Sequence, residues 1–266
     1  MNYTGLVENI LNKAYNAFHE VKQSQKFKEK IKKGYGGDIT LYFDEYVEEV
    51  IINELKDKVG KILSEEKGII EGYGEGIAIV DPVDGSTNTF RNLPFCATTL
   101  VLAKGERFQD IIISGTIDLI RGDMFISDGN KTYLNGKEVK TSKTVDLNEV
   151  IASIDVKLTK ESIIYGKTLN KILEAVRYIR FFGAIALDLA YVASGKLDAF
   201  IVPTPRVRLL DIVGGMFMVK NAGGYVEILN YDLNKVSILE NKRVAVLVTN
   251  NEELAKKIKD IILNEN

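Results

Sequence analysis

The fold is decided by the stretch Ile77-Ala-Ile-Val-Asp-Pro-Val-Asp-Gly-Ser-Thr-Asn88. Its apolar start predicts a buried strand, which is expected to end at Asp81-Pro82 because proline cannot donate to a strand ladder. Asp84 follows on the turn, and Gly85 stands where the backbone must bend or approach a ligand closely. A helix is then expected to begin, since three good N-cap residues come next: Ser86, Thr87 and Asn88.

Two carboxylates on a turn between a strand and a helix leave two interpretations open. Asp81 and Asp84 are suited to a hard cation that holds a phosphate, because such cations prefer oxygen ligands and helix N-terminal amides attract anions. Alternatively, the stretch is only a turn with two solvated acids and a helix cap.

Composition excludes several classes of protein. The net charge of −2, with no basic run, argues against binding to nucleic acid. We find no signal peptide and no apolar run long enough to cross a bilayer, so no membrane partner is expected. The single cysteine, Cys96, cannot form an intramolecular disulfide, which suits a reducing cytoplasm. With one histidine, His19, any metal must rest on oxygen ligands, which indicates magnesium, manganese or calcium.

The first half of the chain is expected to be α+β, with helices before an antiparallel sheet. Apolar residues at helical spacing predict a helix over 4–31 and another from Phe43 to Lys58. Asn135-Gly136 predicts a tight hairpin, because Asn-Gly favours a type I′ turn. Runs of β-branched residues predict the strands Lys61–Ser64, Cys96–Ala103, Asp110–Asp118 and Asp123–Ser127.

The second half alternates strands and helices, an α/β pattern. Polar residues cluster at 141–149, which predicts a division into 1–145, with the metal-binding motifs, and 146–266, with the substrate side and the last metal ligand. The expected strands are Val150–Ile154, Val176–Arg180, Leu197–Val202 and Arg243–Thr249, and the expected helices are Glu161–Glu174, Gly183–Ser194, Leu209–Asn221 and Glu252–Leu263.

Further acids stand beside breaks in the predicted elements. They are Asp38 and Asp44, the pair Glu65-Glu66, and Asp211 at the start of an apolar helix. A buried acid destabilises the fold unless it is paired or bound to metal. For Asp211 both readings stay open, since helix N-cap acids are also common.

These motifs resemble those of the inositol monophosphatase family. Asp81-Pro82-Val83-Asp84-Gly85-Ser86-Thr87-Asn88 is similar to the family's first signature, and Leu210-Asp211-Ile212-Val213-Gly214-Gly215 through Gly224 to its second. Ser64-Glu65-Glu66 and the segment from Asp38 to Asp44 resemble two further family motifs in the same order. Residues 180–187 and 207–211 look closest to an archaeal branch of dual inositol-1-phosphate and fructose-1,6-bisphosphate phosphatases.

The resemblance implies a layered αβαβα sandwich, usually dimeric, with a magnesium-dependent phosphomonoesterase site of two to three metal ions, which manganese can replace. By position, the implied metal ligands are Glu65, Asp81, the Val83 carbonyl, Asp84 and Asp211, with Asp38 on a mobile loop at a third site. Asp44, Ser86 and Glu65 are the implied catalytic residues, Asp44 and Ser86 orienting the water. The implied substrate-binding residues are Gly85, Ser86, Gly183, Ala184, Arg208 and Asp211.

Two departures leave the substrate open. Ser86 stands where most inositol phosphatases have Thr, although Ser is usual among fructose bisphosphatases. Val202-Pro203-Thr204-Pro205 occupies the region where animal inositol phosphatases place a substrate-binding Glu. The alternatives are a nucleotide 3′-phosphatase acting on phosphoadenosine compounds, and a protein of this fold that binds metal or phosphate without turnover.

Arg208 is expected to reach the cleft, because it lies three residues before Asp211. The planar fork of its guanidinium is suited to a second phosphate or to sugar hydroxyls. The alternative is a surface ion pair of little consequence.

Overall fold

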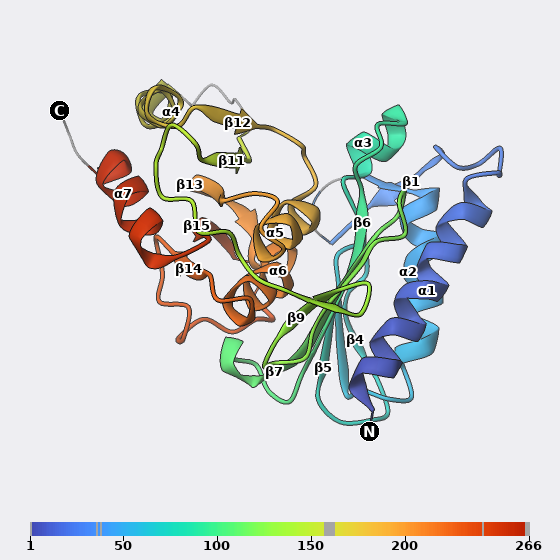
Figure 1. Cartoon of the computed structure of the whole chain (residues 1–266). Helices are drawn as coiled ribbons and strands as arrows, with labels where there is room; N and C mark the ends of the chain where they lie inside the picture. The colour runs from blue at the N-terminus through green and yellow to red at the C-terminus, as the bar shows by residue number, and fades with distance from the viewer. Residues whose placement is uncertain (1, 36, 38, 157–162, 241, 264–266) are drawn as a thin grey trace.

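The computed structural model describes the chain except residues 1, 36, 38, 157–162, 241 and 264–266. Helices and sheets alternate in five layers, and this confirms the predicted αβαβα sandwich (Figure 1). The first helix of the chain lies on one outer face, and the last helix lies on the opposite outer face.

The first outer layer consists of α1 (Tyr3–Val21) and α2 (Tyr42–Leu55). The prediction of a helix over 4–31 is wrong in its end, because the polar stretch after Val21 turns and then forms a short hairpin. Phe27, a buried apolar side chain of that stretch, packs against Phe18 of α1 and Phe43 of α2 and so holds it against both helices. The strands of the hairpin are β1 (Lys30–Lys33) and β2 (Ile39–Leu41).

The large sheet has eight strands in the order β10-β9-β8-β7-β6-β5-β3-β4. The prediction of an antiparallel sheet holds for most neighbours, but β3 and β5 run parallel. The Asn135-Gly136 hairpin is confirmed, with both residues at positive φ as a type I′ turn requires. The strands are β3 (Lys61–Ser64), β4 (Gly68–Glu71), β5 (Ile77–Asp84), β6 (Ala97–Ala103), β7 (Ile111–Asp118), β8 (Met124–Ser127), β9 (Thr132–Leu134) and β10 (Lys137–Val139), with a 3-10 turn η1 (Phe108–Asp110) before β7.

The central strand β5 does not stop at Asp81-Pro82 as predicted. It continues to Asp84, and its register against β6 shifts between Asp81 and Asp84, so a bulge accommodates the proline. The Pro82 carbonyl accepts a hydrogen bond of 2.6 Å from the Thr98 hydroxyl. Both aspartates are therefore held by the sheet itself rather than by a free turn.

The middle layer consists of α5 (Ile185–Ala193) and α6 (Leu209–Asn221), which lie between the two sheets. Nearly every residue of α6 is buried, because the helix packs on a sheet on either side. At Gly215 a Cβ would lie 2.4 Å from the Leu189 Cβ, so the close contact between the two helices requires glycine there.

The small sheet has five strands in the order β12-β11-β13-β15-β14. The predicted strand Leu197–Val202 is too short: β13 continues past Pro203 and Pro205 to Arg208, with irregular pairing between Val202 and Val207. The outer face of the small sheet is covered by α4 (Ile163–Ala175) and α7 (Glu252–Leu263). The strands are β11 (Ile151–Ile154), β12 (Tyr178–Arg180), β13 (Ala199–Arg208), β14 (Tyr225–Ile228) and β15 (Arg243–Thr249).

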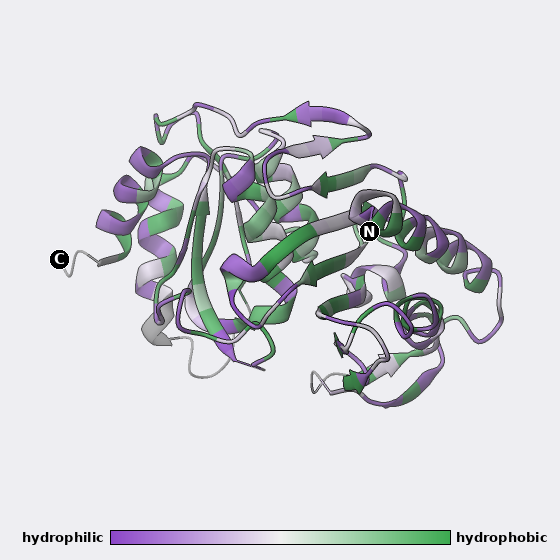
Figure 2. Cartoon of the chain, turned by 90° about the horizontal axis from the view of Figure 1, so that it is seen from below, coloured by the Kyte–Doolittle hydropathy of each residue, from purple (hydrophilic) through white to green (hydrophobic). Residues whose placement is uncertain are grey.

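Hydropathy follows these layers. The outer helices show hydrophilic residues beside hydrophobic ones, whereas the strands and inner helices are mostly hydrophobic (Figure 2). Among the described residues, no helix is long and apolar enough to cross a membrane. The large sheet ends at Val139 and the small one begins at Ile151, so the division expected at residue 145 falls in the connection. The division into two domains at this point stays a prediction.

Candidate active site

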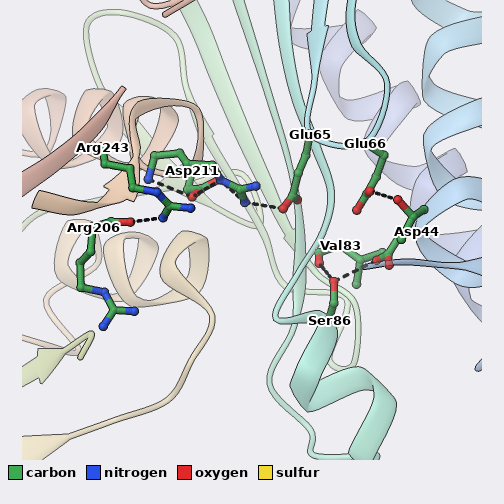
Figure 3. Close-up of polar contacts among 10 residues, drawn as sticks. Asp44, Glu65, Glu66, Val83, Ser86, Arg206, Asp211 and Arg243 are labelled. Atoms are coloured by element: carbon green, nitrogen blue, oxygen red, sulfur yellow. Dashed lines mark hydrogen bonds and ion pairs between the residues drawn. The ribbon is translucent and has the colours of Figure 1, made fainter. Parts of the chain in front are cut away.

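Acids predicted from three separate motifs converge on one cleft. Asp81 and Asp84 come from the end of β5. Glu65 comes from the turn after β3 and Asp211 from the first turn of α6 (Figure 3). All four line a cavity of about 590 Å³, a volume that suits a small-molecule ligand. The sheet and the middle helix layer thus bring together residues 146 positions apart in the sequence (211 − 65).

Asp44 lies behind the cleft wall and reaches it through Ser86. The Ser86 hydroxyl lies 3.0 Å from Asp44 Oδ1 and 2.9 Å from the Val83 carbonyl oxygen. Since a hydroxyl carries one hydrogen, it donates to one of these acceptors at a time. Asp44 is 1% exposed, and its other oxygen accepts 2.9 Å from the Leu41 amide. Burial, followed by the charges of Glu66 and Glu65, raises the pKa of Asp44 well above its ordinary value.

Asp81 and Asp84 form the buried centre of the cluster. Asp81 is 2% exposed, and its Oδ1 has no hydrogen-bond partner within the part of the chain that the structure describes. Asp84 Oδ2 accepts from the Ala186 amide at the start of α5. Burial is the largest cause that raises the pKa of both carboxyls, and neighbouring acids add to it. Two neighbouring buried carboxyls, one with an oxygen that accepts no hydrogen bond, are chemically suited to bind a cation.

Arg208 reaches the cleft, as predicted, and contacts acids there. Its guanidinium lies between two predicted metal ligands: Nη2 is 2.9 Å from Asp211 Oδ1 and forms a close ion pair with Glu65. Nε lies 3.0 Å from Asp211 Oδ2. The alternative of a surface ion pair is wrong, because Arg208 is only 9% exposed. Its predicted contact with a second phosphate stays a prediction.

Charge explains how this triad is held together. Burial alone would lower the pKa of Arg208, but the carboxylates of Asp211 and Glu65 raise it above its ordinary value. Burial raises the pKa of Asp211 to about 6, against the opposing effect of Arg208. Asp211 also accepts a hydrogen bond of 3.2 Å from the Arg208 backbone amide. The N-cap of α6 is Arg208, and Asp211 is the third helical residue, so the N-cap interpretation of Asp211 is wrong although its carboxylate does cap the helix start.

The donor set fits a hard divalent cation, although the side chains are not gathered around one. Within the described ranges, no group of three or more His, Cys, Asp or Glu side chains is close enough to hold a metal ion. The unsatisfied Asp81 oxygen and the all-oxygen character of the set suit a hard divalent cation such as magnesium, manganese or calcium. The ligands would be Glu65, Asp81, the Val83 carbonyl, Asp84 and Asp211. The predicted third-site residue, Asp38, lies outside the described residues.

The predicted substrate-side residues are partly gathered at the cleft. Gly85, Ser86 and Gly183 line the cavity, whereas Ala184 is fully buried. Gly85 has φ of 89°, and a Cβ there would lie 2.9 Å from the Phe95 carbonyl oxygen. Glycine is therefore required at the turn that carries Ser86 into the cleft.

Several residues at the cleft were not predicted to act there. Glu66 was predicted only as one of the acids beside a break; it accepts from the Thr40 hydroxyl, and burial raises its pKa to about 7. Lys30 and Arg91 line the cavity as cations, and Asp155 lines it while pairing with Arg206 at 3.6 Å. Lys30, Arg91 and Asp155 carry no local signal in the sequence, since they meet only through the folding of distant segments.

Comparison with known proteins agrees with this architecture. The sequence profile described as the inositol monophosphatase family matches residues 4–263. A fructose-1,6-bisphosphatase/inositol-1-monophosphatase of Methanocaldococcus jannaschii is 31% identical over 228 residues, covering 85% of this chain and 86% of that protein. A bifunctional NADP phosphatase/NAD kinase of Methanococcus maripaludis is 29% identical over 281 residues, covering 96% of this chain and 49% of that protein.

Solved structures agree on the fold. The crystal structure of an inositol monophosphatase–fructose 1,6 bisphosphatase matches with a TM-score of 0.82 at 27% identity, covering 98% of this chain and 100% of that one. The chain therefore belongs to the inositol monophosphatase family and is a phosphoric monoester hydrolase of this generally metal-dependent kind.

Proposed function

We propose that this chain is a magnesium-dependent phosphomonoesterase that hydrolyses inositol-1-phosphate, fructose-1,6-bisphosphate or both by attack of an activated water. One observation carries the proposal: the Ser86 hydroxyl joins buried Asp44 to a cleft whose acids, Asp81 and Asp84, lack enough cations to balance them. A phosphate dianion would be repelled from these acids unless divalent cations accompanied it.

The chain's own groups account for how a water would be activated. Magnesium, or manganese in its place, would neutralise the acids, polarise the phosphoryl group and lower the pKa of the attacking water. Ser86 would hold that water in line with the phosphorus, because its hydroxyl stands at the cleft surface. Asp44 would take the proton through Ser86, and its raised pKa makes it a stronger base than an ordinary carboxylate.

The cleft also supports a substrate larger than phosphate itself. Lys30 and Arg91 line it as cations, and Asp155 adds an acceptor that suits a sugar or inositol hydroxyl. The proposal also includes a homodimer in the cytoplasm, as the resemblance implies. Light scattering coupled to gel filtration tests the dimer.

A nucleotide phosphatase is the second candidate. The NADP phosphatase/NAD kinase that aligns with 96% of this chain favours a nucleotide substrate. Phosphate attached to a ribose is chemically similar to phosphate on inositol, so the same acids and water would serve both reactions. The two candidates differ in what the outer cleft must accommodate.

The test compares three substrates at equal concentration: inositol-1-phosphate, fructose-1,6-bisphosphate and NADP. Phosphate release is measured with excess MgCl2 and again after dialysis against EDTA. The proposal expects turnover of one or both sugar phosphates that disappears with EDTA and returns with magnesium. Turnover of NADP alone would select the second candidate, and rates unchanged in EDTA would exclude the magnesium mechanism.

A further inference from the structure

We propose that Arg208 takes the place of a metal ion in the metal-free protein: its guanidinium pairs with Glu65 and Asp211 when no divalent ion is bound, and leaves both when one binds. The inference rests on the proposed metal-dependent function. It assigns Arg208 a positioning role in metal binding that is separate from any contact with substrate.

The first support is that the guanidinium uses the oxygen atoms that a metal would need. Nε lies 3.2 Å from Asp211 Oδ1 and 3.0 Å from Oδ2, so both oxygens of that carboxylate face it. Nη2 is within bonding distance of Asp211 Oδ1 and of Glu65 Oε1. A divalent ion held by Glu65 and Asp211 would meet the positive charge of Arg208 at the same oxygens.

The second support is burial. Arg208 and Asp211 are each 9% exposed, and the Glu65 side chain is 15% exposed. Buried carboxylates of this kind are strongly destabilising when they lose their partner. Without metal the folded chain therefore needs Arg208 in place, whereas a divalent ion would supply more charge and release it.

The third support is that the Arg208 guanidinium can move away from the two acids into the cleft. Its Nη1 has no hydrogen-bond partner among the residues that the structure describes, and the side chain already lines the cavity. Asp211 keeps its 3.2 Å hydrogen bond from the Arg208 backbone amide whatever the side chain does. The guanidinium can thus turn toward the cleft without uncapping α6.

Two consequences follow from competition at shared oxygens. Divalent ions should bind more weakly than the acid count suggests, because each binding event must displace an ion pair. Arg208 should also stabilise the metal-free protein but contribute little once metal is bound. A residue that merely braced the fold would stabilise both states equally.

The experiment compares the whole chain with the variants Arg208→Gln, Arg208→Lys and Arg206→Gln. Arg206 is the matched control, since it lies two residues away and pairs with the cleft residue Asp155 rather than with Glu65 or Asp211. Binding of Mn²⁺ and Mg²⁺ is measured by calorimetry, and thermal unfolding is measured in EDTA and in saturating MgCl2. Neither measurement depends on turnover.

We expect Arg208→Gln to bind divalent ions about tenfold more tightly, because the guanidinium that competes for the same oxygens is gone. Its melting temperature should fall in EDTA and recover in MgCl2, so that the metal-induced rise exceeds that of wild type. Arg206→Gln should behave as wild type in both assays. Folding of Arg208→Gln only when metal is present would support the inference in the same way.

Metal affinity in Arg208→Gln that equals or falls below that of wild type would overturn the inference. Equal losses of stability in EDTA and in MgCl2 would also overturn it. So would an Arg206→Gln variant that binds divalent ions as tightly as Arg208→Gln, since the loss of any nearby positive charge would then have the same effect. If Arg208→Gln folds in neither condition, Arg208→Lys decides: its single ammonium should hold the acids less well and still tighten metal binding, and unchanged binding would contradict this. If the wild-type protein bound no divalent ion at all, that result would contradict both the proposed function and the inference.

Discussion

The Ser86 hydroxyl lies 3.0 Å from Oδ1 of Asp44, a residue 42 positions earlier in the chain and on the opposite side of the cleft wall. Asp44 is fixed by the Leu41 amide at the start of α2, and Ser86 by the left-handed turn at Gly85. Two local structures, each determined by its own short sequence, therefore build one hydrogen-bonded link between a buried carboxyl and the cavity.

Ser86→Ala should lower kcat about 10²-fold, because the water would lose both its positioning contact and its path to Asp44. The melting temperature should change little, since only a part-buried hydroxyl is removed. Ser86→Thr is the matched variant: it keeps the hydroxyl and should retain activity. Phosphate release under saturating magnesium is the measurement, and a Ser86→Ala enzyme as active as Ser86→Thr would refute the assigned role.

Asp84→Asn should lower activity by about 10³-fold, because it removes charge from the proposed metal ligands. Folding should persist, since the amide oxygen can still accept from the Ala186 amide. Asp128→Asn is the control, because Asp128 makes similar backbone contacts at the turn between β8 and β9. Calorimetry should show weaker magnesium binding in Asp84→Asn alone, and strong turnover of that variant in excess magnesium would count against the site.

The metal-free protein should lose stability as pH rises from about 4 to 7. Burial raises the pKa of Glu66 from 4.5 to about 7 and that of Asp211 from 3.8 to about 6. Between the ordinary and the raised pKa the folded state binds more protons than the unfolded state, so stability is present at low pH and lost as pH rises. Each excess proton contributes a slope of about 1.4 kcal/mol per pH unit.

Denaturant unfolding in EDTA across this pH range checks the sign. Glu66→Gln removes one of the titrating groups, so its stability should vary less steeply with pH than that of wild type. Saturating magnesium should also flatten the dependence, because bound cations favour the ionised carboxylates. Stability that increased with pH in EDTA would contradict the prediction.

Sequence patterns predicted the layers better than the details of the strands. Helices α6 and α7 and strand β15 match their predicted bounds, since each is a clear periodic or β-branched run between breaks. The errors occurred where local rules met tertiary contacts. Pro82 and Pro203 stand at predicted strand ends, yet each lies in an irregularly paired stretch of a strand that stays paired with its neighbour on either side.

Prediction of the site was limited in the same way: motifs identified residues but not their contacts with distant segments. Motifs identified Asp44, Asp81, Asp84 and Asp211, and the fold brings all of them to one cleft or directly behind its wall. The pairing of Arg208 with both Glu65 and Asp211 could not be predicted, because it depends on the distance between two sheets. Spacing in the sequence carries no information on that distance.

The last prediction concerns Gly85, the residue that directs β5 into the site. Its φ of 89° disfavours any side chain, and a Cβ would lie 2.9 Å from the Phe95 carbonyl oxygen and 3.1 Å from the Ala184 Cβ. Gly136 provides the matched control, since its φ is 77° but nothing in the described structure lies within 4 Å of a Cβ there.

Gly136→Ala should therefore show only the backbone strain, about 1 kcal/mol of unfolding free energy. Gly85→Ala should lose about 1–3 kcal/mol more, because the backbone must shift to relieve the contact with Phe95. That shift would move Ser86 away from Asp44, so kcat should fall in Gly85→Ala and not in Gly136→Ala. Denaturant unfolding and phosphate release measure the two effects. Equal losses in the two variants would mean that conformation alone, and not the crowding around the turn, requires glycine at residue 85.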